Sequence, residues 1–385
     1  MRFAQVIALD KLKQQLRSDV NSSRISHAQM FCGEQGGGSY PLALAYATYI
    51  MCENPTHGDS CGECASCYKM DRLAHPDLHF VFPVNDAKAS STDKPTSDKY
   101  IQQWRDMVLD GAGYINISQW YKELGIENKQ GLIRREEANE IIRKVSLKSF
   151  EGGYKVVIVF MPELLRDEAA NSLLKVIEEP PAQTLFLFVS SQSDRIIGTI
   201  RSRVQSIVVP PLSDDEIAHE LVAREITDRD TAQEIAHSVR GNWGRALQVA
   251  QSGEDDEIYQ EFVGLMRLCY LSNYLGIFDW VNSISSRGRE FHKRFCTVSL
   301  DLIRDCYMEG IGLSSLNFAL PDRVAFVRKF APFANHSTMD RFVQEYELLL
   351  RDLTRNGNSK IVFTHFALTL CKIFAIAKME INKTK

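Results

Sequence analysis

The strongest constraint on this chain is a repeated alternation of apolar runs and amphipathic segments in its first half. Apolar runs at residues 29–31, 155–160, 184–189 and 207–209 are typical of buried parallel strands. Between them, apolar residues recur at helical spacing, most clearly over residues 133–145. Strands that alternate with helices predict a parallel sheet covered by helices on both faces. This part of the chain is therefore expected to have an α/β fold.

The pattern changes after Pro210 and Pro211, beyond which the chain reads as helix. Ser213 and Glu216 have the spacing of a capping box at the start of a helix. Further on, Leu and Phe recur at three- and four-residue spacing, which indicates buried helix faces rather than cofactor pockets. We expect domain boundaries near residues 210 and 253, which give domains at 1–210, 211–253 and 254–385.

Length and charge limit the function classes open to the chain. With 385 residues it should hold more than one domain, because a single hydrophobic core stops growing at roughly 250 to 300 residues. The net charge of −4 argues against a protein that binds DNA alone through a strongly basic face. No apolar run approaches the ~18 residues of a membrane span, and the first residues are not a secretory signal. We expect a cytoplasmic protein with no membrane partner.

Residues 83–130 interrupt the α/β pattern. Residues 83–99 are poor in apolar residues and rich in Ser, Thr, Asp and Lys, which predicts a loop. Residues 100–124 regain aromatic content and are expected to form a small helical insertion. The pattern does not indicate where this insertion packs.

A cysteine cluster, C-x8-C-x2-C-x2-C, predicts a metal site. Its members are Cys52, Cys61, Cys64 and Cys67. Four thiolates saturate zinc and leave no position for water, so the predicted site is structural. The alternative is a set of reduced thiols or a redox pair, which needs only two cysteines. His75 and His79 follow closely but are expected to be ordinary structural histidines.

A Gly-rich segment, "GEQGGGSY", joins the first predicted strand to a helix. Gly33 and Gly38 have the spacing of a phosphate-binding loop, G-x-x-x-x-G-K-[ST]. Ser39 stands where the phosphate-binding Lys belongs, and Tyr40 where the magnesium ligand belongs. Without the ammonium and the hydroxyl ligand, ATP hydrolysis is expected to fail. Taken alone, the segment is better explained as a simple turn.

A second defect downstream favours the degenerate phosphate loop. The strand at 155–159 should end in an acidic pair that positions magnesium and water. It ends instead in Phe160 and Met161. The loss of both halves of one catalytic apparatus predicts an ATPase fold that has lost catalysis.

Several motifs in a fixed order now reveal a resemblance. They are "HAQMFCG" with the Gly-rich loop, the cysteine cluster, "HPDL", "KVVIVF", "AANSLLKVIEEPP" and "IRSRVQ". In this order they resemble the clamp-loader subunits of bacterial DNA polymerase III. The resemblance covers about residues 1–250, although residues 83–130 are longer than that family would require. The degenerate loop is similar to the delta prime type, whereas the gamma/tau type keeps an intact loop.

The resemblance implies a fold and a set of partners. The fold would be an AAA+ module with a three-layer α/β core, a small helical lid and a helical collar that holds five subunits in a ring. It also implies zinc on the four cysteines, gamma/tau and delta subunits as neighbours, and action on a sliding clamp and primed DNA. The chain would be a non-catalytic subunit of a DNA-directed DNA polymerase complex, with ATP bound weakly or not at all.

The resemblance further implies a role for Arg203. In "RSRVQ" it occupies the place of the family's Ser-Arg-Cys arginine, which reaches the γ phosphate on a neighbouring subunit, and Val204 replaces the cysteine. An arginine supplied in trans stabilises charge on the transferring phosphoryl group. Arg201 is the alternative. Ser190 and Ser191, at a sensor position of the family, are interpreted as a strand end.

Two rival functions stay open. One is an active AAA+ ATPase of the gamma/tau type with an unusual loop. The other is a free-standing zinc-dependent nucleic-acid binder, which should bind DNA alone with a steep salt dependence.

Glu178 and Glu179 close a helix where acidic residues oppose the helix dipole, so local propensity does not explain them.

Overall fold

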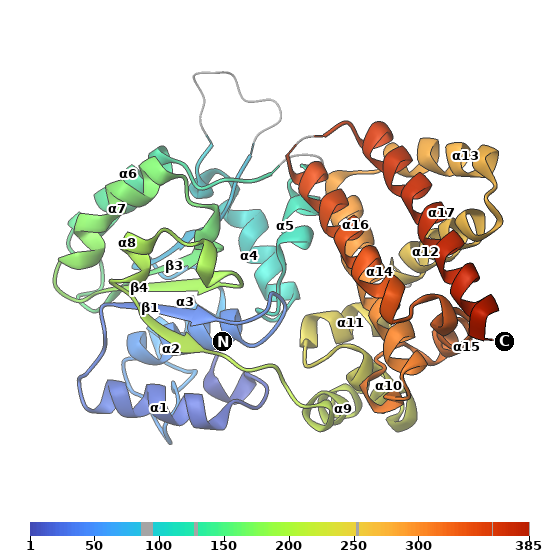
Figure 1. Ribbon diagram of the computed structural model, residues 1–385. Coiled ribbons are helices and arrows are strands. Elements are labelled where there is room, and N and C mark those ends of the chain that lie inside the picture. Colours follow the sequence, from blue (N-terminus) through green and yellow to red (C-terminus); the bar gives the residue numbers. More distant parts are fainter. Residues whose placement is uncertain (86–94, 127–129, 252–253, 356, 385) are drawn as a thin grey trace. The chain divides into compact units, whose positions relative to one another are not determined.

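The computed structural model describes residues 1–85, 95–126, 130–251, 254–355 and 357–384 (Figure 1). Two compact units emerge from the contacts within the chain. They are Met1–Glu225 with Arg240–Ala246, and Ile226–Val239 with Leu247–Lys385. The domain boundaries predicted near residues 210 and 253 stay predictions, and residue 253 lies outside the described part.

A five-stranded parallel sheet forms the centre of the first unit. Its strands stand in the order β2-β3-β4-β1-β5. The register places Met30 of β1 opposite Phe188 of β4, and Phe186 of β4 opposite Val157 of β3. The strands are β1 (Ala28–Cys32), β2 (Leu78–Val81), β3 (Lys155–Phe160), β4 (Thr184–Ser190) and β5 (Gln205–Val208).

Helices cover both faces of this sheet, as predicted. Val156 and Ile158 of β3 belong to one buried apolar cluster, whereas Val157 and Val159 belong to another, because side chains alternate along a strand. On the first face lie α1 (Asp10–Asn21), α2 (Ser39–Met51), α3 (Ala65–Asp71), α4 (Ile101–Asp110) and α5 (Ile117–Glu123). On the second face lie α6 (Arg135–Ser146), α7 (Asp167–Glu178) and α8 (Gly198–Arg201) (Figure 1). The three-layer α/β core is therefore confirmed.

Strand β2 was not predicted. It is only four residues long and lies at the edge of the sheet, beside β3. It follows directly on "HPD", and a run this short carries too little periodicity to separate it from a loop. The predicted strands at 29–31, 155–160, 184–189 and 207–209 are confirmed, with shifts of one or two residues at their ends.

The aromatic segment before residue 124 is helical, as expected, and it packs into the core. Trp104 of α4 and Trp120 of α5 are both fully buried. The Trp104 ring stacks on Phe82 with centroids 4.2 Å apart, and the Trp120 indole N–H donates to the Pro83 carbonyl at 2.7 Å. Most of the loop predicted at 83–99 falls on residues 86–94, outside the described part; a short helical turn, Ser97–Tyr100, follows it.

The capping box at Ser213 is confirmed. The Ser213 hydroxyl accepts from the Glu216 N–H at 3.3 Å, and the Glu216 carboxylate accepts from the Ser213 N–H at 2.8 Å. Helix α9 (Asp214–Ala223) begins there. Helices α10 (Arg229–Ser238) and α11 (Trp243–Gln251) follow.

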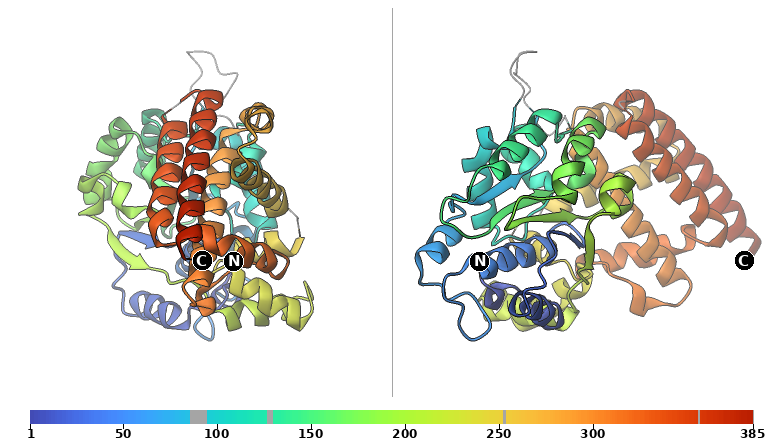
Figure 2. Two further views of the ribbon diagram at one scale, coloured as in Figure 1. Left: turned by 45° about the vertical axis from the view of Figure 1, so that its right-hand side comes forward. Right: turned by 90° about the vertical axis from the view of Figure 1, so that its left-hand side faces the viewer.

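The second unit is built from helices, as predicted. Phe262, Phe330, Phe342 and Phe374 meet in one buried aromatic core. Helices α14 and α16 pack along each other, and so do α16 and α17 (Figures 1 and 2). Besides α10, its helices are α12 (Glu254–Leu271), α13 (Tyr274–Ser285), α14 (Arg289–Gly310), α15 (Pro321–Phe330), α16 (His336–Thr354) and α17 (Ser359–Thr384).

Helix α17 is long and apolar. Its stretch Ser359–Ile381 reaches the length and mean hydropathy, 1.6, that a membrane span requires. Phe363, Phe366 and Leu370 on this helix are buried in the helical core. The core helix of a soluble protein has the same composition, so the helix is no strong evidence for a span.

Candidate functional site

The Gly-rich segment forms the turn between β1 and α2. The Gly33 N–H donates to the Ser190 carbonyl at 3.1 Å, which fixes the start of the turn against β4. Gly36 has φ +76°, a left-handed conformation that glycine adopts without a Cβ penalty. Gly38 caps α2, so the turn delivers Ser39 and Tyr40 into the first helical turn. The predicted strand, turn and helix are thus in place.

Backbone groups of the turn are bonded within the protein. The Gly36 N–H donates to the Ile115 carbonyl at 2.9 Å, and the Gly37 N–H donates to the Glu34 carbonyl at 3.1 Å. The Gln35 amide oxygen accepts from the Ile117 N–H at 2.9 Å. In a phosphate-binding loop such N–H groups surround phosphate oxygens. Here the Ile115 carbonyl, from the helical insertion, accepts from the Gly36 N–H, in the place that a phosphate oxygen would take.

A second segment closes over the same turn. The Asn242 side chain donates to the Gln35 carbonyl at 2.8 Å, and the Gly244 N–H donates to the Gly36 carbonyl at 2.8 Å. A Cβ on Gly244 would lie 3.0 Å from the Gly36 Cα, so a side chain there would force the backbone of the turn to shift. The turn is therefore held from two sides by residues that lie far from it in sequence.

The side chains at the two positions that bind phosphate and magnesium in the phosphate-loop signature are buried. Ser39 and Tyr40 are each 3 % exposed. The Tyr40 ring meets Phe160 edge to face at 5.6 Å and Trp104 at 6.0 Å between centroids. Burial raises the pKa of the Tyr40 phenol far above its ordinary value, so the group stays neutral. Aromatic packing occupies the positions of the metal ligand and of the acid at the end of β3, and a buried serine occupies that of the ammonium.

An acidic residue does stand near this position, and the sequence analysis missed it. Glu163 lies three residues beyond β3, in the short turn Pro162–Leu164 that follows Met161. Its carboxylate accepts from the Ser190 hydroxyl at 2.9 Å and from the Ser191 N–H at 3.1 Å, and also bonds Gln192. The expectation that Ser190 and Ser191 only end a strand is therefore incomplete. A search for an acid beyond Phe160 and Met161 could have found Glu163.

The space enclosed by the turn is small. The cavity measures about 10 Å³, room for about one water molecule. Its walls combine the turn, the insertion and the ends of β3 and β4. The lining residues are Gly33, Glu34, Gln35, Gly36, Gly37, Ser39, Tyr40, Ile115, Phe160, Met161, Val189, Ser190 and Ser191.

Arg203 lies elsewhere in the first unit, just after α8, and does not line this cavity. Its side chain is 34 % exposed, and its Nε donates to the Glu178 carboxylate at 3.0 Å. Its Nη1 donates to the Thr199 carbonyl at 3.0 Å and to the Ser202 hydroxyl at 3.3 Å. Arg201, the alternative, is 49 % exposed, and within the described part of the chain its side chain pairs with Asp194 alone, at 3.6 Å.

The four cysteines converge on one point, as their spacing predicted. All four Sγ atoms lie within 4.8 Å of one another. The Sγ of Cys61 is 3.6 Å from that of Cys52 and 3.9 Å from that of Cys67. Sulfurs bound to zinc at about 2.3 Å would lie about 3.8 Å apart in a tetrahedron. The donor set therefore fits a tetrahedral thiolate-bound metal ion.

Backbone N–H groups support the sulfurs. The Cys61 Sγ accepts from the N–H groups of Glu63 at 3.4 Å and Cys64 at 3.3 Å, which lowers the pKa of this thiol to about 7. The Cys64 Sγ accepts from the Cys67 N–H at 3.3 Å. Such bonds stabilise thiolates, the form that binds metals. Hydrogen bonding thus favours the thiolate at Cys61, whereas burial raises the pKa of the Cys52 and Cys67 thiols.

The two nearby histidines do not join the cluster. The His75 ring is 4 % exposed; its Nε2 lies 2.9 Å from Glu151, and its Nδ1 accepts from the Asp77 N–H. Burial lowers the pKa of His79 to about 4, so that ring is neutral at neutral pH. Neither residue belongs to the group of four ligands. Both act as structural histidines, as predicted.

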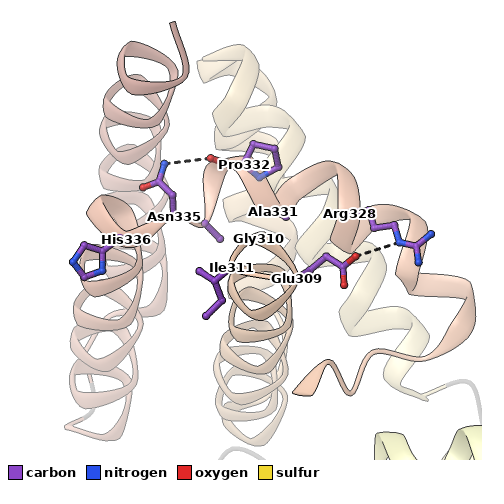
Figure 3. A pocket seen from close by; sticks show the side chains of 9 residues that line it. Glu309, Gly310, Ile311, Arg328, Ala331, Pro332, Asn335 and His336 are labelled. Atoms are coloured by element: carbon purple, nitrogen blue, oxygen red, sulfur yellow. Dashed lines mark hydrogen bonds and ion pairs between the residues drawn. The ribbon is translucent and has the colours of Figure 1, made fainter. Parts of the chain in front are cut away.

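A larger surface pocket of about 390 Å³ lies in the helical unit (Figure 3). It sits between the end of α14 and the start of α16, where Arg328 bonds Glu309 at 3.3 Å and Asn335 bonds the Pro332 carbonyl at 3.2 Å. It contains none of the residues that the sequence analysis singled out. The predicted aromatic core of this unit is itself packed.

The first half of the chain matches a known protein family. The family described as "DNA polymerase III, delta subunit" matches residues 8–213, more than half of the chain. This range contains the Gly-rich turn, the four cysteines and Arg203.

Curated relatives carry related names. The chain is 28% identical to DNA polymerase III subunit delta' of Escherichia coli, over 62% of this chain and 58% of that protein. It is 30% identical to subunit delta' of Haemophilus influenzae, over 59% of this chain and 56% of that protein. The chain thus spans somewhat over half the length of these relatives.

A solved structure is also similar. It is a DNA polymerase III gamma subunit-related protein from Thermotoga maritima, with a TM-score of 0.42 and 16% identity over 94% of this chain and 99% of that one. The family match confirms the resemblance that the sequence motifs indicated. The chain belongs to the DNA polymerase III delta subunit family.

Proposed function

We propose that this chain is a delta prime type subunit of the DNA polymerase III clamp loader, without ATP hydrolysis of its own. It would hold the shape of a five-subunit ring with gamma/tau and delta subunits. It would help to open a sliding clamp and place it on primed DNA. The subunit would have no catalytic activity of its own, although it would belong to a DNA-directed DNA polymerase complex. We place it in the cytoplasm.

The closed Gly-rich turn carries this proposal. The Gly36 N–H is bonded to Ile115, and the cavity behind it has room for about one water molecule. Tyr40 and Phe160 pack against each other where a magnesium ligand and an acid would be needed. Binding of a nucleotide would require the insertion, the turn and this aromatic pair to separate. ATP would therefore bind weakly or not at all.

The chain would act on ATP through Arg203. A guanidinium is permanently charged and planar, so it can stabilise charge on a phosphoryl group held by a neighbouring subunit. Arg203 is supported for this role by hydrogen bonds that hold its guanidinium while the side chain stays one-third exposed. Arg201 has a single long contact and ranks second.

The cysteine cluster would hold zinc. Four sulfurs at tetrahedral spacing leave no open position, so the metal would be structural and would not activate water. The cluster would fix the loop between α2 and α3. Asp59 in that loop accepts from the N–H groups of Phe3 and Ala4 at 3.0 and 2.9 Å, which ties the first residues of the chain to it.

Reconstitution tests the proposal. The chain would be mixed with gamma/tau and delta subunits, and DNA-stimulated ATP turnover would be measured for the wild type and for Arg203→Ala. We expect a stable complex whose turnover falls by at least tenfold in the variant, by analogy with other trans arginines. Arg201→Ala is the matched control and should change turnover little. An unchanged rate with Arg203→Ala would contradict the proposed role.

Turnover by the chain alone separates the rival function. A gamma/tau-like ATPase would hydrolyse ATP without partners, and the activity would be lost on altering Gly38. We expect no hydrolysis by the purified chain. Sustained turnover at the rate of a working ATPase would overturn the proposal.

A further inference from the structure

The end of helix α7 carries a carboxylate that the helix does not favour. Glu178 is the last residue of α7, where the helix dipole is negative and disfavours an acid. The Glu178 side chain is 56 % exposed, so burial in the core does not explain why a glutamate stands at this position. Its carboxylate contacts Arg203, whose Nε donates to Oε2 of Glu178 at 3.0 Å. The position of Glu178 is therefore explained by the arginine and not by its own helix.

The guanidinium of Arg203 is held along one side. Glu178 takes the Nε proton, and the Thr199 carbonyl and Ser202 hydroxyl accept from Nη1. Within the described part of the chain, Nη2 makes no hydrogen bond. The arrangement fixes the plane of the group and leaves one nitrogen available to a further acceptor.

The backbone on each side of this pair is anchored in the core. Ile177, next to Glu178, and Val204, next to Arg203, are buried in the same apolar cluster. The Arg203 N–H donates to the Ile200 carbonyl at 2.9 Å, which ties it to α8. Both side chains therefore start from rigid positions, and their contact does not depend on a mobile loop.

We propose that Glu178 is the positioning residue for Arg203. The inference rests on the proposed function of Arg203 as an arginine supplied to a neighbouring ATP site. An arginine side chain has many rotamers, and ordering it at the moment of reaction costs entropy. Glu178 orders it in advance and leaves Nη2 for the phosphoryl oxygens. Glu178 itself touches no substrate.

Arg201 illustrates what the pair adds. Among the described residues its side chain pairs with Asp194 alone, at 3.6 Å, and the Asp194 side chain is 99 % exposed. A contact of that length between exposed groups orders a side chain poorly. Arg203 has three acceptors within 3.3 Å, supplied by α7, α8 and the turn after α8.

The test uses the reconstituted complex and a matched pair of variants. Glu178→Ala removes the contact, whereas Glu179→Ala removes an equal charge from the adjacent exposed residue, which has no side-chain partner among the described residues. We expect Glu178→Ala to lower kcat of ATP turnover about 3- to 10-fold with KM unchanged, less than the ~100-fold that a 1 Å misplacement can cost. Glu179→Ala should leave kcat unchanged. Glu178→Gln should lie between, because its amide oxygen still accepts from Nε.

A double variant separates positioning from general damage. If Glu178 acts through Arg203, then Glu178→Ala combined with Arg203→Ala should be no slower than Arg203→Ala alone. Independent multiplication of the two losses would overturn the inference. An equal loss for Glu178→Ala and Glu179→Ala would also overturn it, since it would point to charge alone.

A measurement on the isolated chain keeps the inference distinct from the proposed function. The Nε–H of Arg203 can be followed by NMR for its order parameter and exchange rate. Glu178→Ala should lower the order and speed the exchange, while Glu179→Ala should change neither. An Arg203 that stays ordered in Glu178→Ala rejects the positioning role, whatever the complex does. Arg203→Ala with unchanged turnover rejects the proposed function, while the NMR result still decides what orders Arg203.

Discussion

Tyr40 and Phe160 meet edge to face, with ring centroids 5.6 Å apart and an interplanar angle of 88°. The first residue comes from the start of α2 and the second from the end of β3. A phosphate-binding loop would have a hydroxyl at one position and an acid near the other. Here both positions belong to a small aromatic core, which Trp104 from the insertion completes.

This aromatic core should contribute measurably to stability. Tyr40→Ala would leave a cavity between Trp104 and Phe160 and should lower the free energy of unfolding by about 3 to 5 kcal/mol. Tyr40→Phe keeps the ring and should cost less than about 1.5 kcal/mol. Urea unfolding followed by tryptophan fluorescence would measure both. Equal losses would show that the phenol hydroxyl, and not ring packing, matters.

Restoring the loop signature should not restore nucleotide binding. Ser39→Lys combined with Tyr40→Thr supplies the missing ammonium and hydroxyl. The Gly36 N–H stays bonded to Ile115, and Phe160 still stands in place of the acid. Titration with a fluorescent ATP analogue should therefore show no saturation at millimolar nucleotide. Circular dichroism would verify folding, and micromolar binding by this variant would contradict the closed turn.

The close approach of Gly244 to Gly36 should make this position intolerant of a side chain. A Cβ on Gly244 would lie 3.0 Å from the Gly36 Cα and 3.1 Å from its oxygen, and neither backbone atom can move cheaply. Gly244→Ala should lower the free energy of unfolding by about 1 to 3 kcal/mol. Gly198→Ala is the control, because nothing lies within 4 Å of its Cβ; it should be neutral or slightly stabilising. Thermal melts of the two variants should shift in opposite directions, or differ clearly in size.

Loss of one cysteine from the cluster should release the metal. Cys64→Ser removes one of four ligands, and we expect the bound zinc to fall below one ion per chain. The melting temperature should drop by about 5 to 10 °C, because structural zinc contributes folding free energy. Elemental analysis and calorimetry would measure the two effects. Cys32→Ser, which lies outside the cluster, should keep both metal and stability.

Stability should depend on pH through Glu137. This carboxyl on α6 is 3 % exposed, and burial raises its pKa to about 7; the Ser97 N–H donates to it at 2.6 Å. The folded pKa lies above the unfolded value, so the folded state binds more protons at intermediate pH. The stability that protonated Glu137 contributes is fully present below about pH 4.5. It is lost as the pH rises to about 7, and the free energy of unfolding falls by up to about 3 kcal/mol.

Glu137→Gln isolates this contribution. The amide cannot ionise, so the difference in unfolding free energy between variant and wild type should grow in favour of the variant from pH 5 to pH 8. Denaturant titrations at several pH values would measure it. A difference that is flat with pH would place the proton elsewhere.

Much of the α/β core could be predicted, because its signals are local. The apolar runs of β3 and β4 and the capping box at Ser213 each lie within a few residues. The four cysteines also lie close in sequence, and their convergence follows from two short C-x2-C steps. Strand β2 was missed because Leu78–Val81 owes its conformation to its pairing with β3 rather than to its own pattern.

The closure of the Gly-rich turn could not be predicted. It depends on the Ile115 carbonyl and on Asn242, which lie about 80 and 200 residues away and carry no recognisable motif. Such contacts are set by tertiary packing, which local propensity does not encode. Glu178 was noticed as an oddity in the sequence, but its partner became visible only when α7 and the turn after α8 were placed side by side.

The shared packing of Tyr40, Trp104 and Phe160 also restricts which sequences can follow this one. Each ring is in contact with the others, so a lysine, a threonine or an aspartate introduced at any single position would leave a hole or an unpaired polar group before it offered any chemistry. A working phosphate and magnesium site would require several coordinated replacements in this core. Any single replacement would destabilise the fold before it contributed to nucleotide binding.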